Sequence, residues 1–420
     1  MELKTVILIG GPQKGTRFRP LSLELPKPLF PIAGCPLIQH HMEACCKVPN
    51  MKEIILIGYY QQNESLSRFI ASMQQEYKIP VRYLQEFQPL GTVGGLYHFR
   101  DQIMLGNPDA LIVLYADISS DFPLKEMWEF HKAHNHGKHT VLGTESAPNQ
   151  ASDNGVMVED PKTHQLLHYV EKPETYVSSL INCGAYIFSP TIFNALKALR
   201  ERNVEQSSEQ VNTNNVGRIM MGEQLMPYLA GQSLVYVFKT DNFWTVLKSA
   251  GSAIFANKNF LDLYKTAHPK RLTSNDENKP TIIGDVYIHS TATIDHSAVI
   301  GPNVSIGSGV IIGPGTRIKD AIILDKAEIR EHCCILYSIV GWNCVIGAWS
   351  RIEGTKFEPN PNEPHARLAS ESLFQKDGRL IASTTVLGRN VTINPELVIR
   401  NSIVLPYKEI SSSFKNEIIL

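Results

Sequence analysis

The stretch IGGPQKGTRFRPLSLELPKPL, residues 9–29, is the main indication of the fold of the first half of the chain. It continues an apolar run of strand-forming residues, Thr5–Ile9, which predicts a buried parallel strand. Gly10 and Gly11 end that strand. Glycines in this position let backbone N–H groups turn inward and line a cup for phosphate oxygens. The stretch therefore predicts a strand followed by a phosphate-binding loop.

Two basic residues of the same stretch, Arg17 and Lys27, would bring positive charge to the phosphates. The whole string resembles the signature of the sugar-1-phosphate nucleotidylyltransferases, which join a sugar 1-phosphate to a nucleoside triphosphate and release pyrophosphate. The family pattern is GG, one residue, GTR, and a PKP further on. Here Pro12, Gln13 and Lys14 stand where the family has one residue. The added length, up to about 7 Å of chain, has two possible outcomes. Either the loop bulges and leaves Gly15 and Arg17 in place, or it displaces Arg17 and puts Lys14 where the triphosphate tail should run.

Strand-like apolar runs alternate with helical patterns over residues 1–265. The alternation predicts an α/β domain with a doubly wound, mostly parallel sheet, whose ligand lies at the carboxyl ends of the strands. By the resemblance this is the Rossmann-like nucleotidylyltransferase domain. The polar stretch 203–217 predicts a surface loop or short disordered insert. Further strands are expected at 54–57, 81–84 and 111–114, and a helix at 66–77.

After a polar linker, residues 266–280, the apolar residues recur every six positions. This period predicts a parallel β-helix, in which each aliphatic side chain points into the prism at a triangular corner. Residues 281–420 thus resemble the left-handed hexapeptide β-helix that follows several nucleotidylyltransferase domains. Residues 355–386 interrupt the period and are too many for one coil, so they predict a protruding loop. The expected corner residues are 282, 288, 294, 300, 306, 312, 318 and 324, then 340, 346 and 352, then 387, 393, 399 and 405.

Further segments match the family in its own order. Asp117 follows a buried strand and corresponds to a metal-binding Asp. The loop 88–95 resembles the one that contacts nucleobase and ribose, and the segments 170–173 (VEKP) and 181–184 (INCG) resemble those that contact the sugar and its phosphate. The nucleotide-sugar-binding residues that the resemblance implies are Gly10, Gly11, Gly91, Thr92, Gly94, Asp117, Glu171, Lys172, Asn182 and Gly184.

The second metal position departs from the family. Active members carry an Asp in a segment FWxDxG, but here residues 243–248 read FWTVLK, so Val246 takes its place. A valine has no oxygen to offer to Mg²⁺, which requires oxygen ligands in octahedral geometry. Asp241 lies an odd number of residues away, so in an extended segment its side chain faces the other way. We therefore expect Mg²⁺ binding to be impaired and no residue to be catalytic, with Arg17, Lys27 and Asp117 as vestiges.

Composition excludes several classes of protein. The formal net charge is −1, which predicts no basic surface for nucleic acid or an anionic membrane. No stretch approaches the roughly 20 apolar residues of a membrane span. The seven cysteines are an odd number without CxxC spacing. They indicate reduced thiols in a cytoplasmic protein, and neither disulfides nor a zinc site.

The sequence thus keeps the nucleotide- and sugar-recognition segments while it loses part of the metal and triphosphate apparatus. This combination resembles the regulatory subunits of GDP-mannose pyrophosphorylase (mannose-1-phosphate guanylyltransferase) complexes. The resemblance implies a subunit without catalytic activity, from a GTP-binding family, that senses GDP-mannose. It also implies that this subunit inhibits a catalytic beta subunit by allosteric feedback and forms homo- and hetero-oligomers. The alternative is an active mannose-1-phosphate guanylyltransferase. A third hypothesis, an acyltransferase built on the β-helix, would use His289, His296 or His332 as its base.

The inserted loop 355–386 has its own signature. It contains a proline-rich beginning, PNPNEP, and the apolar pair Leu373-Phe374. Prolines lower the entropy lost when a segment becomes ordered, and an exposed apolar pair can anchor a contact. We therefore expect a docking arm for the catalytic subunit, with a tolerated insertion as the alternative.

Overall fold

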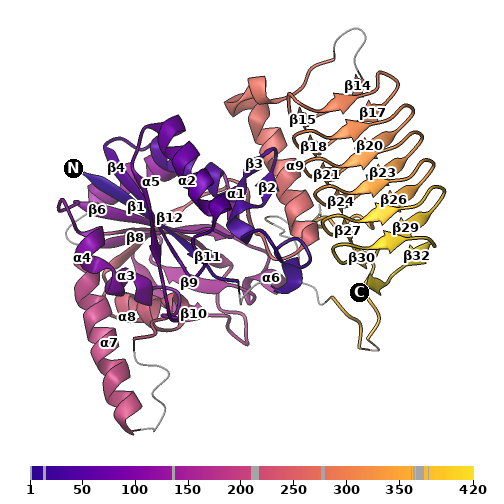
Figure 1. The fold of residues 1–420 in the computed structure, drawn as a ribbon. Helices are drawn as coiled ribbons and strands as arrows, with labels where there is room; N and C mark the ends of the chain where they lie inside the picture. Colours follow the sequence, from indigo (N-terminus) through magenta and orange to yellow (C-terminus); the bar gives the residue numbers. More distant parts are fainter. Residues whose placement is uncertain are drawn as a thin grey trace. The chain divides into compact units, whose positions relative to one another are not determined.

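The structure, a computed structural model, describes residues 2–12, 16–134, 138–209, 217–275, 280–360, 362, 365, 373–376 and 378–420 (Figure 1). The described residues form two compact units. The first takes residues from 1–14, 38–244 and 360–367, and the second takes residues from 15–37, 245–359 and 368–420. The segment after the glycine loop therefore belongs to the same unit as the C-terminal half of the chain.

A nine-stranded sheet forms the centre of the first unit. Its strands run in the order β10-β9-β11-β6-β1-β4-β5, with β8 beside β11 and β12 beside β8. The strands β6, β1, β4 and β5 are parallel, whereas β11 joins β6 antiparallel. The predicted α/β fold is confirmed. The strands are β1 Leu3–Gly10, β4 Met51–Gly58, β5 Val81–Gln85, β6 Ala110–Tyr115, β8 His139–Glu145, β9 Gly155–Glu159, β10 Leu166–Glu171, β11 Leu180–Phe188 and β12 Val235–Lys239.

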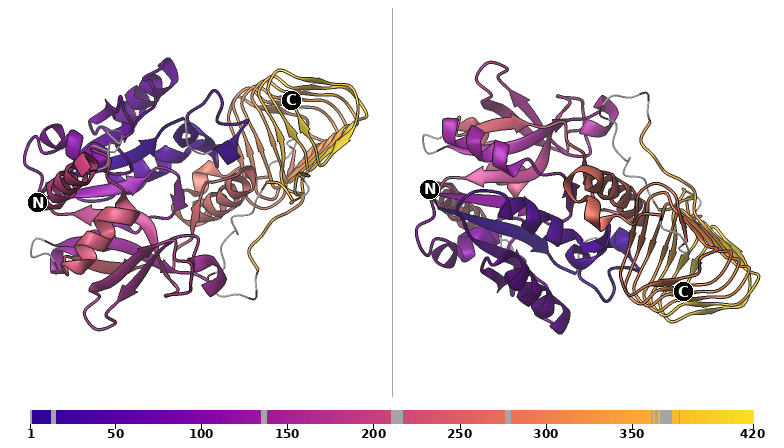
Figure 2. Two further views of the ribbon diagram at one scale, coloured as in Figure 1. Left: turned by 90° about the horizontal axis from the view of Figure 1, so that it is seen from below. Right: turned by 90° about the horizontal axis from the view of Figure 1, so that it is seen from above.

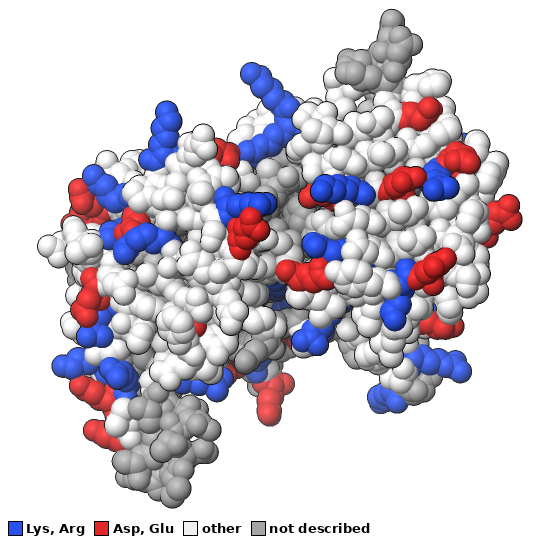
Figure 3. All heavy atoms as spheres, in the orientation of Figure 1, with Lys and Arg blue, Asp and Glu red and all other residues white. Residues whose placement is uncertain are grey.

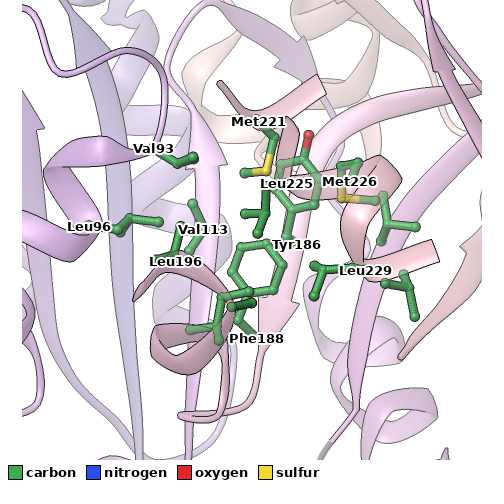
Figure 4. Packing of buried hydrophobic residues seen from close by; sticks show 14 of the residues in the cluster. Val93, Leu96, Val113, Tyr186, Phe188, Leu196, Met221, Leu225, Met226 and Leu229 are labelled. Carbon is green, nitrogen blue, oxygen red and sulfur yellow. The ribbon is translucent and has the colours of Figure 1, made fainter. Parts of the chain in front are cut away.

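The core of this unit lies where two helices pack on the sheet (Figure 4). Tyr186 and Phe188 of β11 stack with ring centroids 5.4 Å apart and meet Leu196 of α7 and Met226 of α8 in one buried cluster. The burial of such large side chains is the main stabilising contribution of the sheet–helix layer. The helices are α1 Leu37–Cys46, α2 Glu64–Tyr77, α3 Gly94–His98, α4 Arg100–Ile103, α5 Leu124–His134, α6 Pro148–Ala151, α7 Ile192–Glu209, α8 Met226–Gly231 and α9 Ala250–Ala267.

The expected loop at 203–217 is wrong in its first part. Helix α7 continues to Glu209, and the buried Asn203 donates from Nδ2 to the carbonyl oxygen of Arg218 at 2.8 Å. Glu, Gln and Arg are good helix formers, so a polar sequence can extend a helix whose first turns are already packed. Residues 210–216 lie outside the described ranges.

The C-terminal half of the second unit consists of three parallel sheets, the arrangement of a left-handed β-helix (Figure 2). Figure 2 views the coils nearly end-on, and each coil has three sides. The sheets run β14-β17-β20-β23-β26-β29-β32, β15-β18-β21-β24-β27-β30-β33 and β16-β19-β22-β25-β28-β31. The strands are β14 281–282, β15 286–288, β16 293–294, β17 299–300, β18 304–306, β19 311–312, β20 317–319, β21 321–323, β22 328–329, β23 334–336, β24 338–340, β25 345–346, β26 351–353, β27 385–387, β28 392–393, β29 398–400, β30 403–404, β31 409–410, β32 414–415 and β33 418–419.

Two of the predicted corner positions are off by one residue. Ile323, and not Leu324, pairs in register with Ile306 and Val340, and Val404, and not Leu405, pairs with Leu387. The chain makes these corners with one residue fewer than the six-residue period, and Asp320, Tyr337 and Asn401 have left-handed conformations there with φ between 46 and 49°. The six-residue period therefore continues through Ile329 and Ile335, which the sequence pattern missed.

The inserted loop leaves the β-helix after β26 and returns at β27, which starts at Thr385. Val386 is therefore a strand residue and not part of the loop. The two ends of the loop are joined by a hydrogen bond from the Thr355 N–H to the Ser383 carbonyl oxygen at 3.0 Å. Part of the expected linker 266–280 is also structured, because α9 reaches Ala267 and a 3-10 turn, η5, covers Pro269–Arg271.

Surface charge agrees with the composition. On the face shown in Figure 3, acidic and basic side chains are interspersed. None of the helices in the described ranges combines the length and the apolar character needed to cross a membrane. All seven cysteines are free thiols.

Candidate functional site

The glycine loop begins where β1 ends. Gly10 has φ +67°, and its carbonyl oxygen accepts a hydrogen bond from the Tyr59 N–H at 2.7 Å. A Cβ atom on Gly11 would lie 2.8 Å from the Cβ of Tyr59, so a side chain there would force a shift. The lengthened part of the loop, residues 13–15, lies outside the described residues. Arg17 and Lys27 lie in the second unit, in the 3-10 turns η1 Thr16–Phe18 and η2 Lys27–Leu29.

The loop expected to contact the nucleobase packs against a segment far along the chain. Gly91 has φ +84°, and a Cβ atom there would overlap the backbone of Ile219. A Cβ on Gly94 would lie 2.7 Å from the carbonyl oxygen of Gly217. The Thr92 hydroxyl accepts a hydrogen bond from the Met221 N–H at 2.6 Å. Close backbone packing therefore explains part of the need for small residues here.

A carboxylate that the sequence reasoning missed stands beside this loop. Glu86 directly follows β5, and a Cβ atom on Gly95 would collide with its Oε1. Burial raises the pKa of Glu86 to about 7. Perturbed carboxylates at the end of a parallel strand are typical of functional sites. The signal that could have identified Glu86 was its position immediately after a strand that runs parallel to β4.

The predicted sugar segments meet in a network of buried hydroxyl groups. The Asn182 Nδ2 donates to the hydroxyl oxygens of Tyr186 at 2.7 Å and Tyr169 at 3.1 Å. Tyr169 in turn donates to Glu171 Oε2 at 2.9 Å. Asn182 Oδ1 accepts from the Gly184 N–H at 2.9 Å. Burial holds the pKa values of Tyr169 and Tyr186 above the ordinary value, so both hydroxyls stay protonated and available for hydrogen bonds.

Lys172 has a different environment from this network. It is exposed and has φ +46°, and its backbone N–H donates to the carbonyl oxygen of Asn154 at 3.1 Å. A non-glycine residue in the left-handed region is uncommon and often marks a functional position. Within the ranges that the structure describes, its ammonium group forms no ion pair. The geometry thus leaves the Lys172 ammonium accessible to an anion.

Residues 217–222 join the two groups of predicted residues. Ile219 and Met221 contact the loop that carries Gly91, and a Cβ atom on Gly222 would collide with the carboxylate of Glu171. A π-helical turn, η4 Met221–Leu225, follows directly. Such turns are rare and occur often at functional sites. The sequence reasoning missed this segment because no motif marks it.

The two expected metal positions provide little for Mg²⁺. Asp117, in the turn between β6 and β7 (Ile118–Ser120), is half-buried and lies in the first unit. Val246 is the last residue of β13 (Trp244–Val246), is half-buried, and belongs to the second unit. Among the described residues, no three His, Cys, Asp or Glu side chains gather into a metal-binding group. An aliphatic side chain at position 246 does not fit an octahedral oxygen site.

The three histidines of the acyltransferase hypothesis lie on the coils of the β-helix. His289 Nδ1 lies 2.9 Å from the Thr291 hydroxyl, and His296 Nδ1 lies 3.4 Å from Asp295. The His332 ring stacks on the exposed Trp349 with centroids 4.2 Å apart. Each of the three histidines therefore has a local side-chain partner on the β-helix.

Comparisons with known proteins identify both halves of the chain. Residues 4–227 match the family model of nucleotidyl transferases, and residues 282–419 match that of the GMPPB C-terminal domain. The chain is 54% identical to the zebrafish (Danio rerio) mannose-1-phosphate guanylyltransferase regulatory subunit alpha-B over 424 aligned residues, covering 100% of both chains. It is 53% identical to the human (Homo sapiens) regulatory subunit alpha, again over 100% of both.

A solved structure is similar in fold. The crystal structure of a putative glucose-1-phosphate thymidylyltransferase from Bacillus anthracis superposes with a TM-score of 0.50. It covers 61% of this chain and 94% of its own, at 20% sequence identity.

Proposed function

The chain belongs to the nucleotidyl transferase family, and from this membership we propose that it is a catalytically silent subunit that binds GDP-mannose and inhibits a catalytic partner. Its relatives are named regulatory subunits of mannose-1-phosphate guanylyltransferase, a name that implies a catalytic subunit beside them. The main observation behind the proposal is a contrast. Val246 stands at the metal position, whereas residues 217–222 still contact both the loop that carries Thr92 and the carboxylate of Glu171.

Guanine recognition is assigned to Glu86. The Watson–Crick edge of guanine presents two neighbouring donors, the N1–H and the exocyclic amine, and an ionised carboxylate accepts both. Adenine has no such donor pair on that edge. Glu86 lies against Gly95, within the segment that carries the predicted nucleobase loop. Its partial burial strengthens a charge-assisted hydrogen bond relative to one in water.

Recognition of the sugar and diphosphate is assigned to the β10–β11 side of the unit. Asn182 and the hydroxyl of Tyr169 hold the Glu171 carboxylate in place, and that carboxylate can accept from sugar hydroxyl groups. Lys172 follows directly and provides a positive charge. GDP-mannose carries two phosphates and needs no triphosphate cup, so its binding depends less on the lengthened glycine loop.

The first test is the titration of the purified chain with GDP-mannose by calorimetry. We expect saturable binding, and we expect Lys172→Ala to weaken it by about 10- to 100-fold, because a charge-assisted phosphate contact is typically worth about 1.5–3 kcal/mol. Lys162→Ala is the matched control, since Lys162 is an exposed lysine in a turn of the same unit. A folded wild-type chain that does not bind GDP-mannose would rule out the sensor function.

The second test uses pH. Because the pKa of Glu86 is raised to about 7, its accepting, ionised form dominates above pH 7 and is lost below it. The diphosphate ester of GDP-mannose does not titrate in this range. We therefore expect affinity to be roughly tenfold weaker at pH 6 than at pH 8. Glu86→Gln should bind weakly at both values and remove the dependence, whereas Glu129→Gln, at an exposed helix position, should keep it. A wild-type affinity that is flat between pH 6 and 8 would contradict the assignment to Glu86.

A further inference from the structure

Residues 16–37, which follow the glycine loop, belong to the same compact unit as the β-helix. This segment carries Arg17 and Lys27, the two basic positions expected to face phosphates. Many side chains of this segment are buried, so its conformation depends on the residues that pack against it. Those packing contacts therefore determine where Arg17 and Lys27 lie. The buried residues of the segment include Phe18, Leu21, Leu29, Phe30 and Ile32.

Aromatic contacts connect this segment to one corner of the β-helix. Phe18, next to Arg17, meets Phe30 edge-to-face with ring centroids 5.0 Å apart. Phe30 meets Trp342 in the same way at 6.2 Å, and the Arg389 guanidinium lies over the Trp342 ring, 5.2 Å from its centroid. Both edge-to-face pairs and cation–π contacts are attractive in this distance range.

A carboxylate between Arg17 and Lys27 in the sequence, that of Glu24, reaches the same corner. One oxygen of Glu24 lies 2.9 Å from Arg389 Nε, and the other accepts a hydrogen bond from the Tyr407 hydroxyl at 2.8 Å. Both carboxylate oxygens are thus used by residues of the β-helix. An ion pair that is about one-third exposed is weak when it stands alone, but here it acts on a segment that the aromatic contacts already hold.

Trp342, Arg389 and Tyr407 form a ladder, one from each of three consecutive coils. The Asn390 N–H donates to the Trp342 carbonyl oxygen at 2.8 Å, and the Tyr407 N–H donates to the Arg389 carbonyl oxygen at 2.8 Å. Because neighbouring coils are bonded backbone to backbone, the three side chains have fixed spacing. They form a rigid surface for the segment to rest on.

The far end of the segment is held separately. The Ala33 N–H donates to Asn257 Oδ1 of α9 at 2.8 Å, and Asn257 Nδ2 donates to the carbonyl oxygen of Asn303 at 3.3 Å. Gly34 has φ +83°, and a Cβ atom there would collide with the ring of Tyr287. This end keeps its contacts when the ladder is altered, so ladder variants should loosen residues 16–30 without unfolding the unit.

We infer that this ladder positions the basic segment for anion binding, with Glu24, Trp342 and Arg389 as positioning residues that touch no ligand themselves. The inference rests on the proposed function for the identity of the anion, the diphosphate of GDP-mannose. It assigns the β-helix a role in ligand affinity in addition to its own fold.

The experiment combines amide hydrogen exchange with ligand titration on the full-length chain. In Arg389→Ala and Glu24→Ala, peptides from residues 16–30 are expected to exchange faster, and GDP-mannose affinity is expected to fall roughly threefold to tenfold. The double variant should lose less affinity than the two single losses combined, because both single variants remove the Glu24–Arg389 pair. Arg330→Ala is the control, since Arg330 pairs on the exposed surface with Glu328. Trp342→Leu tests the aromatic path separately.

The outcomes separate the inference from the proposed function. Unchanged exchange over residues 16–30 in Arg389→Ala would overturn the positioning role. Faster exchange with unchanged affinity would overturn the link to anion binding. A third outcome is that the wild-type chain binds no GDP-mannose, while Arg389→Ala still speeds exchange over residues 16–30 and weakens binding of inorganic pyrophosphate, and Arg330→Ala does neither. In that case the proposed ligand is wrong and the positioning role stands.

Discussion

Incubated with GTP, mannose 1-phosphate and Mg²⁺, the purified chain is expected to release no pyrophosphate above the uncatalysed background. Nucleotidyl transfer depends on metal ions that neutralise the phosphates, a contribution of several kcal/mol to the transition state. Val246 has no oxygen for the metal, and the glycine loop is longer than in the family pattern. The assay follows pyrophosphate release, and GDP-mannose binding is measured on the same preparation. Binding shows that the protein is folded, so unfolding cannot explain a lack of activity.

Val246→Asp is the informative variant for this prediction. We expect it to keep GDP-mannose binding and to remain inactive, because the added carboxylate repairs one defect and leaves the lengthened loop unchanged. Removing Gln13 and Lys14 in addition restores the family spacing, so the combined variant is the one expected to gain activity. Steady turnover by the unaltered chain would refute the silent-subunit proposal, and rescue by Val246→Asp alone would show that the added loop residues are harmless.

Removal of the inserted loop is expected to abolish inhibition of the catalytic subunit while leaving the complex assembled. The design follows the structure: residues 359–382 are deleted and Glu358 is joined to Ser383 through a short Gly-Ser link. This keeps the Thr355–Ser383 hydrogen bond and the ion pairs of Glu358 with Lys356 and Lys258. It also keeps the hydrogen bond from the Tyr337 hydroxyl to the Phe357 carbonyl oxygen at 2.7 Å.

The measurement is the activity of the catalytic subunit with and without GDP-mannose, in parallel with co-purification of the two chains. A double variant, Leu373→Ser with Phe374→Ser, is the milder companion, because Phe374 is 46% exposed and the pair is the expected anchor. Full inhibition by the deleted chain would show that the loop has no regulatory role. Loss of assembly together with inhibition would instead make the loop a structural contact between subunits.

Several site features could not be predicted from the sequence, for a common reason. The contact of Thr92 with Met221 joins residues 129 positions apart. The raised pKa of Glu86 comes from burial by neighbours that the sequence does not place. The hydrophobic pattern of a segment predicts which of its residues face a core. It does not predict which distant segment of the backbone packs against a glycine. For the same reason the Glu24–Arg389 contact has no trace in the sequence around either residue.

The sequence by itself determined the α/β fold, the β-helix and the family, because these follow from local periods and from motifs with fixed spacing. It also determined that position 246 lacks a metal ligand, since the side-chain chemistry of valine is independent of its surroundings. The tertiary structure decided the corner residues Ile323 and Val404, because each has an apolar neighbour, Leu324 or Leu405, and only the register of the coils shows which of the two pairs. It likewise decided that residues 217–222 connect the predicted base and sugar segments, and that residues 16–37 rest on the β-helix. Both are packing outcomes, which depend on the shapes of surfaces brought together only when the whole chain folds.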